Sequence, residues 1–188
     1  MKNLSKKMYL GWIIGSYAAS LAVILTGVIM LVVAAVTKGE KFTAANIGLF
    51  IPGILVLLLG MALASIAAII GYVILYKAWQ AIQDGQPRTT PGKAVGYLFI
   101  PFFNLYWMFI AYWGWAKDCN AYISAKGLSL TPLQEKLYLA YPIVLLCSGI
   151  PYLGSVAGMA TLVIFIIMCI QMIDTVNGIY AARTITPA

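Results

Sequence analysis

Two groups of polar residues in this chain could carry chemistry in an apolar environment. Pro101 and Asn104 interrupt an uncharged aromatic tract, and Gln171, Asp174 and Asn177 recur every three residues near the end of a hydrophobic stretch. Residues spaced by three stay close to one side of a helix. An ionisable group in a membrane helix suits a proton relay, an ion ligand or a counter-ion. With Asn104, the second group is a candidate polar path for a small transporter or channel.

Composition excludes most catalytic and metal-binding chemistry. The 188 residues include no histidine, which excludes histidine-based triads, bis-histidine haem sites and histidine zinc sites. Cys119, Cys147 and Cys169 stand far apart and form no C-x-x-C motif. No nucleophile has an evident base, and only five residues are acidic. We therefore expect no catalytic residue, no cofactor and no metal, in a protein that is not an enzyme.

The same composition indicates an all-α integral membrane protein. Hydrophobic residues make up 63% of the chain and charged residues 9%, against about 25% charged in soluble domains. The charges stand in clusters between long uncharged tracts. In such a chain the net charge of +7 more often sets orientation and contacts anionic headgroups than it binds nucleic acid. Membrane lipids are thus expected partners, and nucleic acid is not.

Four hydrophobic segments are predicted to span the membrane as one domain, residues 1–188. A helix needs about 20 apolar residues to cross a bilayer. Thr131, Pro132 and Gln134 form a capping box, which predicts that the third helix starts at Pro132. Residues 151–154 supply a tight turn before the last helix, which is expected to continue as a polar helix toward Arg183. The predicted spans are residues 10–36, 48–75, 132–150 and 155–173.

The uncharged tract 94–116 differs from these four segments. It contains ten aromatic residues, among them Tyr106, Trp107 and Trp113, and tryptophan and tyrosine prefer the membrane interface. Pro101 removes a backbone donor, and Asn104 is placed to bind the carbonyls that this frees. We expect a re-entrant or interfacial broken helix. Its aromatic residues form either a gate, lipid or partner site, or a wedge that closes the helical bundle.

Charge distribution decides between two topologies. With the broken helix entering and leaving on one face, ten basic residues lie inside and two outside; with five complete spans, each side has six. The positive-inside rule favours the first arrangement, with both termini in the cytoplasm. Five complete spans remain the alternative. The predicted location is the cytoplasmic (inner) membrane, as a multi-pass protein.

A motif around the broken helix resembles a known kind of domain. The run PGKAVGYLFIPFFNLYW, residues 91–107, is similar to the central motif of uncharacterised bacterial multi-helix integral membrane domains: P-x-x-A-x-G, then P-x-x-N-L and an aromatic residue. The resemblance covers about residues 90–120. It implies a bacterial inner-membrane protein of several helices, and it carries over no catalytic residue.

Smaller signals concern packing. Three short amphipathic stretches, beginning at Gln80, Asn120 and Asn177, each follow a hydrophobic segment and precede Thr-Pro, which suits three exits on one face. Asp174 is expected near the interface, solvated or paired with Lys77 or Arg183. Small residues spaced by four let membrane helices approach closely, within the chain or in a homo-oligomer.

Together these features predict a small non-enzymatic membrane protein. It would act as an accessory or scaffold subunit that binds lipid, including anionic headgroups on the cytoplasmic face, or a membrane-protein partner. The absence of charge from the middle of the four predicted spans disfavours ion coupling. The transporter or channel remains the alternative function.

Overall fold

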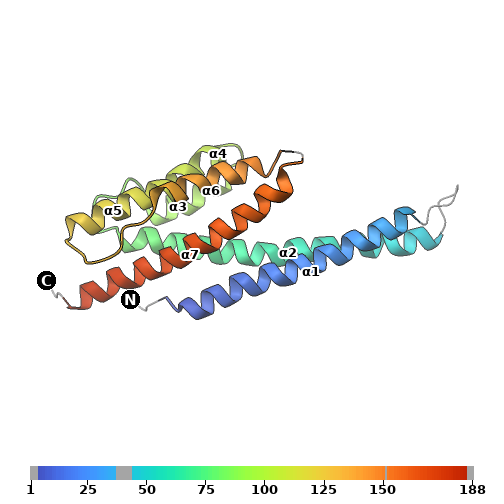
Figure 1. Ribbon diagram of the computed structural model, residues 1–188, viewed down its shortest axis with the longest axis horizontal. Coiled ribbons are helices and arrows are strands. Elements are labelled where there is room, and N and C mark those ends of the chain that lie inside the picture. Colours follow the sequence, from blue (N-terminus) through green and yellow to red (C-terminus); the bar gives the residue numbers. More distant parts are fainter. Residues whose placement is uncertain (1–3, 37–43, 151, 186–188) are drawn as a thin grey trace. The chain divides into compact units, whose positions relative to one another are not determined.

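The computed structural model describes residues 4–36, 44–150 and 152–185 (Figure 1). All regular secondary structure in these ranges is helical. The elements in chain order are α1 (Lys6–Val36), α2 (Ala44–Ala81), α3 (Pro91–Gly96), η1 (Tyr97–Phe99), α4 (Phe103–Met108), η2 (Phe109–Gly114), α5 (Trp115–Ala125), α6 (Glu135–Cys147) and α7 (Gly154–Ile185).

Among the residues that the structure describes, three helices are long and apolar enough to cross a membrane. They cover Lys6–Val36, Gly48–Ala81 and Val156–Thr184. Many of their large apolar side chains are exposed, as expected for surfaces that face lipid rather than water. The all-helical class predicted from the sequence is therefore confirmed, and the three long apolar helices are consistent with a membrane protein.

The chain clusters into two compact units, which are described separately. Unit 1 comprises residues 1–10 and 71–188, and unit 2 comprises residues 11–70. Helices α1 and α2 each contribute to both units, so a single domain over residues 1–188 stays a prediction.

Unit 2 is a hairpin of α1 and α2 that packs closely at glycines. The Ser20 hydroxyl donates to the Gly60 carbonyl at 2.8 Å. A Cβ atom built on Gly60 would lie 2.5 Å from Ile24 Cγ1 and 3.2 Å from the Ile24 backbone nitrogen. Gly27 and Gly53 are similarly tight against leucines of the facing helix. The close helix approach predicted from small residues is present here.

Gly60→Val is expected to destabilise this hairpin by about 1 to 3 kcal/mol, because the added side chain must displace Ile24 and its backbone. Gly11→Val is the matched control, since nothing lies within 4 Å of a Cβ atom built on Gly11. Thermal unfolding of both variants in detergent measures the difference. Equal melting temperatures for the two variants would contradict the close approach at Gly60.

Unit 1 packs α3–α7 with the end of α2 around a core of large side chains. α6 and α7 form an antiparallel hairpin, in which Tyr138 donates to the Met168 carbonyl at 3.5 Å. Tyr152, at the turn, has φ of 68°. Fully buried side chains include Trp79, Trp115, Tyr138, Met168, Met172 and Ile173.

The predicted start of the third span is wrong. Residues 131–134 are not helical, and α6 begins at Glu135 without a side-chain cap. The Asn120 amide explains the difference, because it accepts from the Leu133 N–H at 2.8 Å and donates to the Leu133 carbonyl at 3.0 Å. Through these two hydrogen bonds, the N–H and the carbonyl of Leu133 both have partners without being part of a helix. The 13 residues of α6 extend only about 20 Å.

The predicted continuation of the last helix is present in the structure, since α7 runs through Arg183 to Ile185. α2 extends to Ala81, six residues beyond the predicted end of the second span at residue 75. Pro151 of the predicted turn, and Thr186 and Pro187 of the third repeated stretch, lie outside the described residues.

Candidate functional site

The aromatic tract is broken, as its sequence predicts. α3 starts with Thr90 as N-cap and Pro91 at its first position, and η1 ends at Phe99. Ile100 is extended, at φ −83° and ψ 116°, which is the conformation that a following proline imposes. Phe102 then takes φ of 62°, which is rare for a bulky residue and is found where surrounding structure enforces strain.

Backbone groups, rather than the Asn104 side chain, satisfy this break. The Asn104 N–H donates to the Ile100 carbonyl at 3.0 Å, and the Phe103 N–H donates to the Pro101 carbonyl at 2.7 Å. No hydrogen bond joins the Asn104 side chain to another described residue. The predicted role of Asn104 is therefore wrong, because the turn folds back on itself tightly enough to use its own carbonyls.

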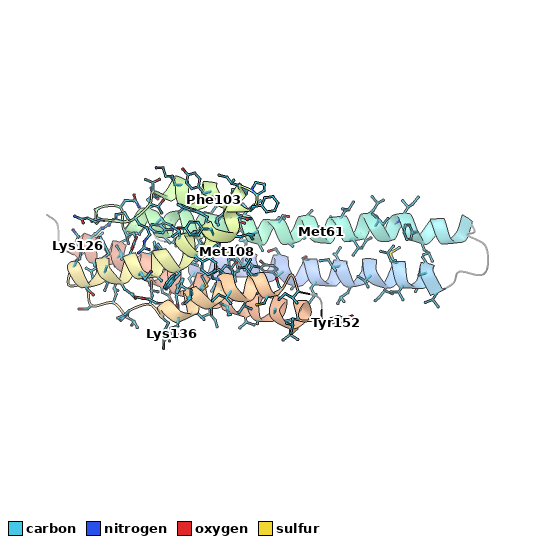
Figure 2. The ribbon with its side chains drawn as sticks, turned by 90° about the horizontal axis from the view of Figure 1, so that it is seen from above. Met61, Phe103, Met108, Lys126, Lys136 and Tyr152 are labelled. Carbon is cyan, nitrogen blue, oxygen red and sulfur yellow. The ribbon has the colours of Figure 1, made fainter. Side chains whose placement is uncertain are left out.

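We define the charged end of unit 1 as the end that carries the ion-paired residues Asp84, Arg88, Asp118, Lys126 and Arg183. The break in the aromatic tract points away from this end. Tyr112 packs against Tyr141, and Trp115 packs against Tyr138, so the helix that starts at α4 runs antiparallel to α6. Moving from Tyr112 back to Phe102 therefore leads toward the α6–α7 turn. Figure 2 shows Lys126 and Tyr152 at opposite ends of unit 1.

An exposed aromatic tip surrounds the break. We define the aromatic tip as Phe99, Phe102, Phe103, Leu105 and Tyr106, all exposed, with Phe102 at 86%. Trp107 stacks on Phe103 and anchors the tip, since its indole N–H donates to the Ala94 carbonyl at 3.1 Å. The indole N–H of Trp107 thus has a hydrogen-bond partner, which leaves the tip with a largely apolar surface.

A π-helical stretch links the tip to α5. Residues Phe109–Gly114 form this stretch, and the buried Trp79 indole N–H donates to the Ala111 carbonyl at 3.0 Å. A π turn disturbs the regular pattern of helical bonding and is frequent at functional sites. Trp79 provides the Ala111 carbonyl with a donor from α2. Nothing in the sequence pattern predicts this pairing.

Two other predicted residues of the aromatic tract have ordinary surroundings. Pro101 is exposed at the break. Trp113 is half-buried, and the Lys117 ammonium lies 3.5 Å from its ring centroid, a cation–π contact.

Two of the three polar residues of α7 hold the N-terminal segment, and the third does not. Asn177 accepts from the Leu4 N–H at 2.7 Å and donates to the Leu4 carbonyl at 2.8 Å. Asp174 pairs with Lys6 at 2.6 Å, so its predicted pairing with Lys77 or Arg183 is wrong. Gln171 Oε1 is buried without a hydrogen-bond partner among the described residues. Through its ion pair with Lys6, Asp174 is expected to hold the N-terminal segment against α7.

Asp174→Asn is expected to change the free energy of unfolding by less than about 1 kcal/mol, because exposed ion pairs contribute little. The Lys6 and Asp174 side chains are 43% and 52% exposed. Chemical unfolding in detergent, at low and high salt, measures the effect. A loss of several kcal/mol would show that Asp174 does more than pair at the surface.

The structure does not assemble the candidate polar path. Asn104 precedes Tyr112 and so lies toward the α6–α7 turn, whereas Asp174 follows Phe165 and lies toward the charged end. The two described cavities of unit 1 include neither residue. The structure therefore does not bring Asn104 together with Asp174, and the transporter or channel alternative stays a prediction.

Ion pairs join several helix ends at the charged end. Asp84 lies between the Arg183 guanidinium and the Lys126 ammonium, the latter at 3.8 Å, and accepts from the Tyr122 hydroxyl at 3.0 Å. Arg183 also donates to the Ala81 carbonyl at 2.6 Å. These contacts connect the ends of α2, α5 and α7.

A second ion pair fixes the loop between α2 and α3. Arg88 binds Asp118 through its backbone N–H at 2.9 Å and through Nε at 2.9 Å. Hydrogen bonding to Asp118 raises the pKa of the Arg88 guanidinium, so it stays charged. Within the described ranges, no three Asp, Glu or Cys side chains are grouped to hold a metal ion.

The two asparagine contacts repeat one geometry that sequence reasoning missed. Asn120 holds both backbone groups of Leu133, and Asn177 holds both backbone groups of Leu4. The signal was present in the sequence, since both asparagines begin repeated amphipathic stretches. Their bonding partners were not predictable, because one lies 13 residues away and the other 173.

Two cavities open beside the loop that joins α2 to α3. One, of about 320 Å³, lies between this loop and α5, next to Asp118, Tyr122 and Lys126. The other, of about 520 Å³, lies between the loop and the aromatic tract, next to Arg88 and Lys93.

This chain matches no family model, no curated protein and no solved structure. The resemblance of residues 91–107 to bacterial integral membrane domains therefore stays a prediction. Functional proposals rest on the geometry of the chain's own residues, above all the aromatic tip and the charged end.

Proposed function

We propose that this chain is a non-enzymatic, multi-pass accessory or scaffold subunit of a bacterial inner membrane. Its aromatic tip contacts lipid or a membrane-protein partner inside the bilayer. The observation that carries the proposal is the exposure of the tip: Phe99, Phe102 and Tyr106 are 66%, 86% and 61% exposed around a strained turn. Such apolar exposure is costly in water and favourable in lipid or against a partner.

The proposed arrangement has four membrane helices and one re-entrant element, with both termini in the cytoplasm. The ion pair of Lys126 with Asp84 supports it, because five complete spans would put these residues on opposite sides of the bilayer. The Arg88–Asp118 pair gives the same support. α6, which extends about 20 Å, would reach across with the non-helical residues that flank it.

The depth of the broken element supports re-entry rather than spanning. Sixteen residues separate Phe102 from Asp118, which is at most about 24 Å of α-helix. The hydrocarbon core is about 30 Å thick. With Asp118 held at the charged end, the tip therefore ends within the bilayer.

Labelling of single cysteines is expected to place Gln86→Cys, Lys126→Cys and Thr184→Cys in the cytoplasm. All three native residues are exposed at the charged end. The chain would carry alanine in place of its three native cysteines. A membrane-impermeant reagent applied from outside should leave them unlabelled and should label Tyr152→Cys, the control at the α6–α7 turn.

Labelling of positions 126 and 184 from outside would instead establish five complete spans. The re-entrant element would then be lost, and cross-linking from position 102 would still show what the exposed aromatic residues contact.

Photo-cross-linking from position 102 tests the role of the aromatic tip. A photoreactive phenylalanine analogue replaces Phe102, and a matched chain carries it at Ile143, which is an exposed apolar residue of α6. In intact cells, position 102 is expected to give a discrete protein or lipid adduct that position 143 does not. Mass spectrometry identifies the adduct. Equal and diffuse cross-linking at both positions would mean that the tip is ordinary lipid-facing surface and not a specific contact site.

A further inference from the structure

The larger of the two cavities described above combines basic and aromatic walls. It has a volume of about 520 Å³ and lies between the α2–α3 loop and the aromatic tract. Residues that line it include Gln83, Arg88, Thr89, Lys93, Tyr97 and Trp107. No acidic residue is among its described lining residues. Its wall therefore favours an anion.

The two cations of this cavity are held differently. Asp118 fixes Arg88 through the backbone N–H, Nε and Nη2, so that Arg88 is already ordered before a ligand arrives. Nη1 makes no hydrogen bond to a described residue. Lys93 is exposed and forms no ion pair within the described part of the chain. A fixed guanidinium and an unpaired ammonium suit the oxygens of a phosphate group.

Thr89 adds an unexplained polar group to the same wall. Its side chain is buried, with 8% of the residue exposed, and Oγ1 has no hydrogen-bond partner among the described residues. Buried hydroxyl groups normally have partners, because an unsatisfied one is destabilising. The Gln83 amide donates to the Thr89 carbonyl at 3.2 Å and so fixes this residue in the wall. Because this oxygen is buried, a rotation of the Thr89 side chain would bring the hydroxyl to a ligand oxygen in the cavity.

The opposite wall suits an acyl chain or glycerol backbone. Tyr97 and Trp107 pack edge to face at 4.8 Å between centroids. The Trp107 indole N–H is already bonded to Ala94, so its ring presents apolar surface. From this wall the aromatic tip continues away from the charged end. Basic residues beside tyrosine and tryptophan are typical of headgroup depth.

We propose that this cavity binds the headgroup of an anionic phospholipid. Arg88 and Lys93 contact the phosphate oxygens, Thr89 donates to one of them, and the acyl chains follow Tyr97 and Trp107 toward the tip. The proposal rests on the membrane placement of the proposed function. It adds a specific ligand class and a site that is separate from the tip itself.

Native mass spectrometry of the full chain in mild detergent tests this site. Phosphatidylglycerol is expected to bind at least about tenfold more tightly than phosphatidylcholine. Lys93→Gln should weaken phosphatidylglycerol binding about fivefold, the usual contribution of one basic residue near an anionic surface. Lys136→Gln is the matched control, since Lys136 is exposed, basic and outside the cavity. Lys93→Arg should restore binding.

Three outcomes would overturn the proposal. Equal affinity for the two lipids would remove the charge selectivity, and equal losses for Lys93→Gln and Lys136→Gln would indicate diffuse surface attraction. Competition by millimolar inorganic phosphate would indicate a soluble anion rather than a lipid. None of these results alters the topology labelling or the cross-linking at position 102, so failure of the lipid site can be told from failure of the proposed function.

Discussion

Asn120→Leu is expected to lower the free energy of unfolding by about 2 to 4 kcal/mol, because it leaves both the N–H and the carbonyl of the buried Leu133 without partners. The change also removes the Asn120 bond to the Glu135 carboxylate at 3.0 Å. Leucine has as many side-chain heavy atoms as asparagine, so the effect reports mainly the lost hydrogen bonds. Chemical unfolding in detergent, followed by circular dichroism, measures it.

Asn120→Asp tests the donor half of this contact. The aspartate keeps an acceptor for the Leu133 N–H, but it sets a carboxylate against the Leu133 carbonyl and the Glu135 carboxylate, so we expect a loss at least as large as that of Asn120→Leu. Ser124→Ala, at an exposed position of the same helix, should be near neutral. If Asn120→Leu and Ser124→Ala unfold alike, water replaces the asparagine amide at Leu133 and the contact is not structural.

Trp79→Ala should cost about 3 to 5 kcal/mol, as removal of a fully buried aromatic side chain does. Trp79→Phe keeps most of the apolar volume but removes the donor to the Ala111 carbonyl. Its expected cost is about 1 to 3 kcal/mol, that of an unsatisfied buried carbonyl. Thermal unfolding in detergent ranks the two variants, and Tyr76→Phe, at an exposed position of α2, is the control.

A second measurement links Trp79 to the π-helical stretch. Hydrogen exchange in residues 109–114 should become faster in Trp79→Phe, because the Ala111 carbonyl would lose the donor that favours the π geometry. Unchanged exchange there, with the stability loss as expected, would mean that Trp79 acts only through packing.

The sequence predicted the features that depend on neighbouring residues. Pro101 specified the break, since a proline forces the preceding residue out of the helical region. Long uncharged tracts specified the long helices, and the polar stretch after the last tract specified that α7 continues. Each of these signals acts over a few residues and needs no knowledge of the fold.

The missed features depend on partners that are distant in sequence. The capping box at Thr131 is a valid local signal, yet Asn120 holds Leu133 outside the helix through two hydrogen bonds. Asp174 has its partner 168 residues away, at Lys6. The prediction for Asn104 failed for a different reason, which is local. Backbone N–H groups at the break donate to backbone carbonyls there, so the Asn104 side chain is not needed. Local rules fail where a long-range contact supplies an alternative.

The π-helical stretch also bears on how this chain tolerates changes in length. A π turn is equivalent to one extra residue in an α-helix, and one residue corresponds to about 100° of rotation. Because the wide turn takes up the extra residue, deleting one residue from Phe109–Gly114 would restore a regular helix and keep α4, with the aromatic tip, in the same rotational phase relative to α5. The part of the helix that carries the tip and the part that Asp118 and Asn120 anchor would keep their relative orientation. A further single-residue insertion that a regular α-helix does not absorb would instead turn the tip by about 100°.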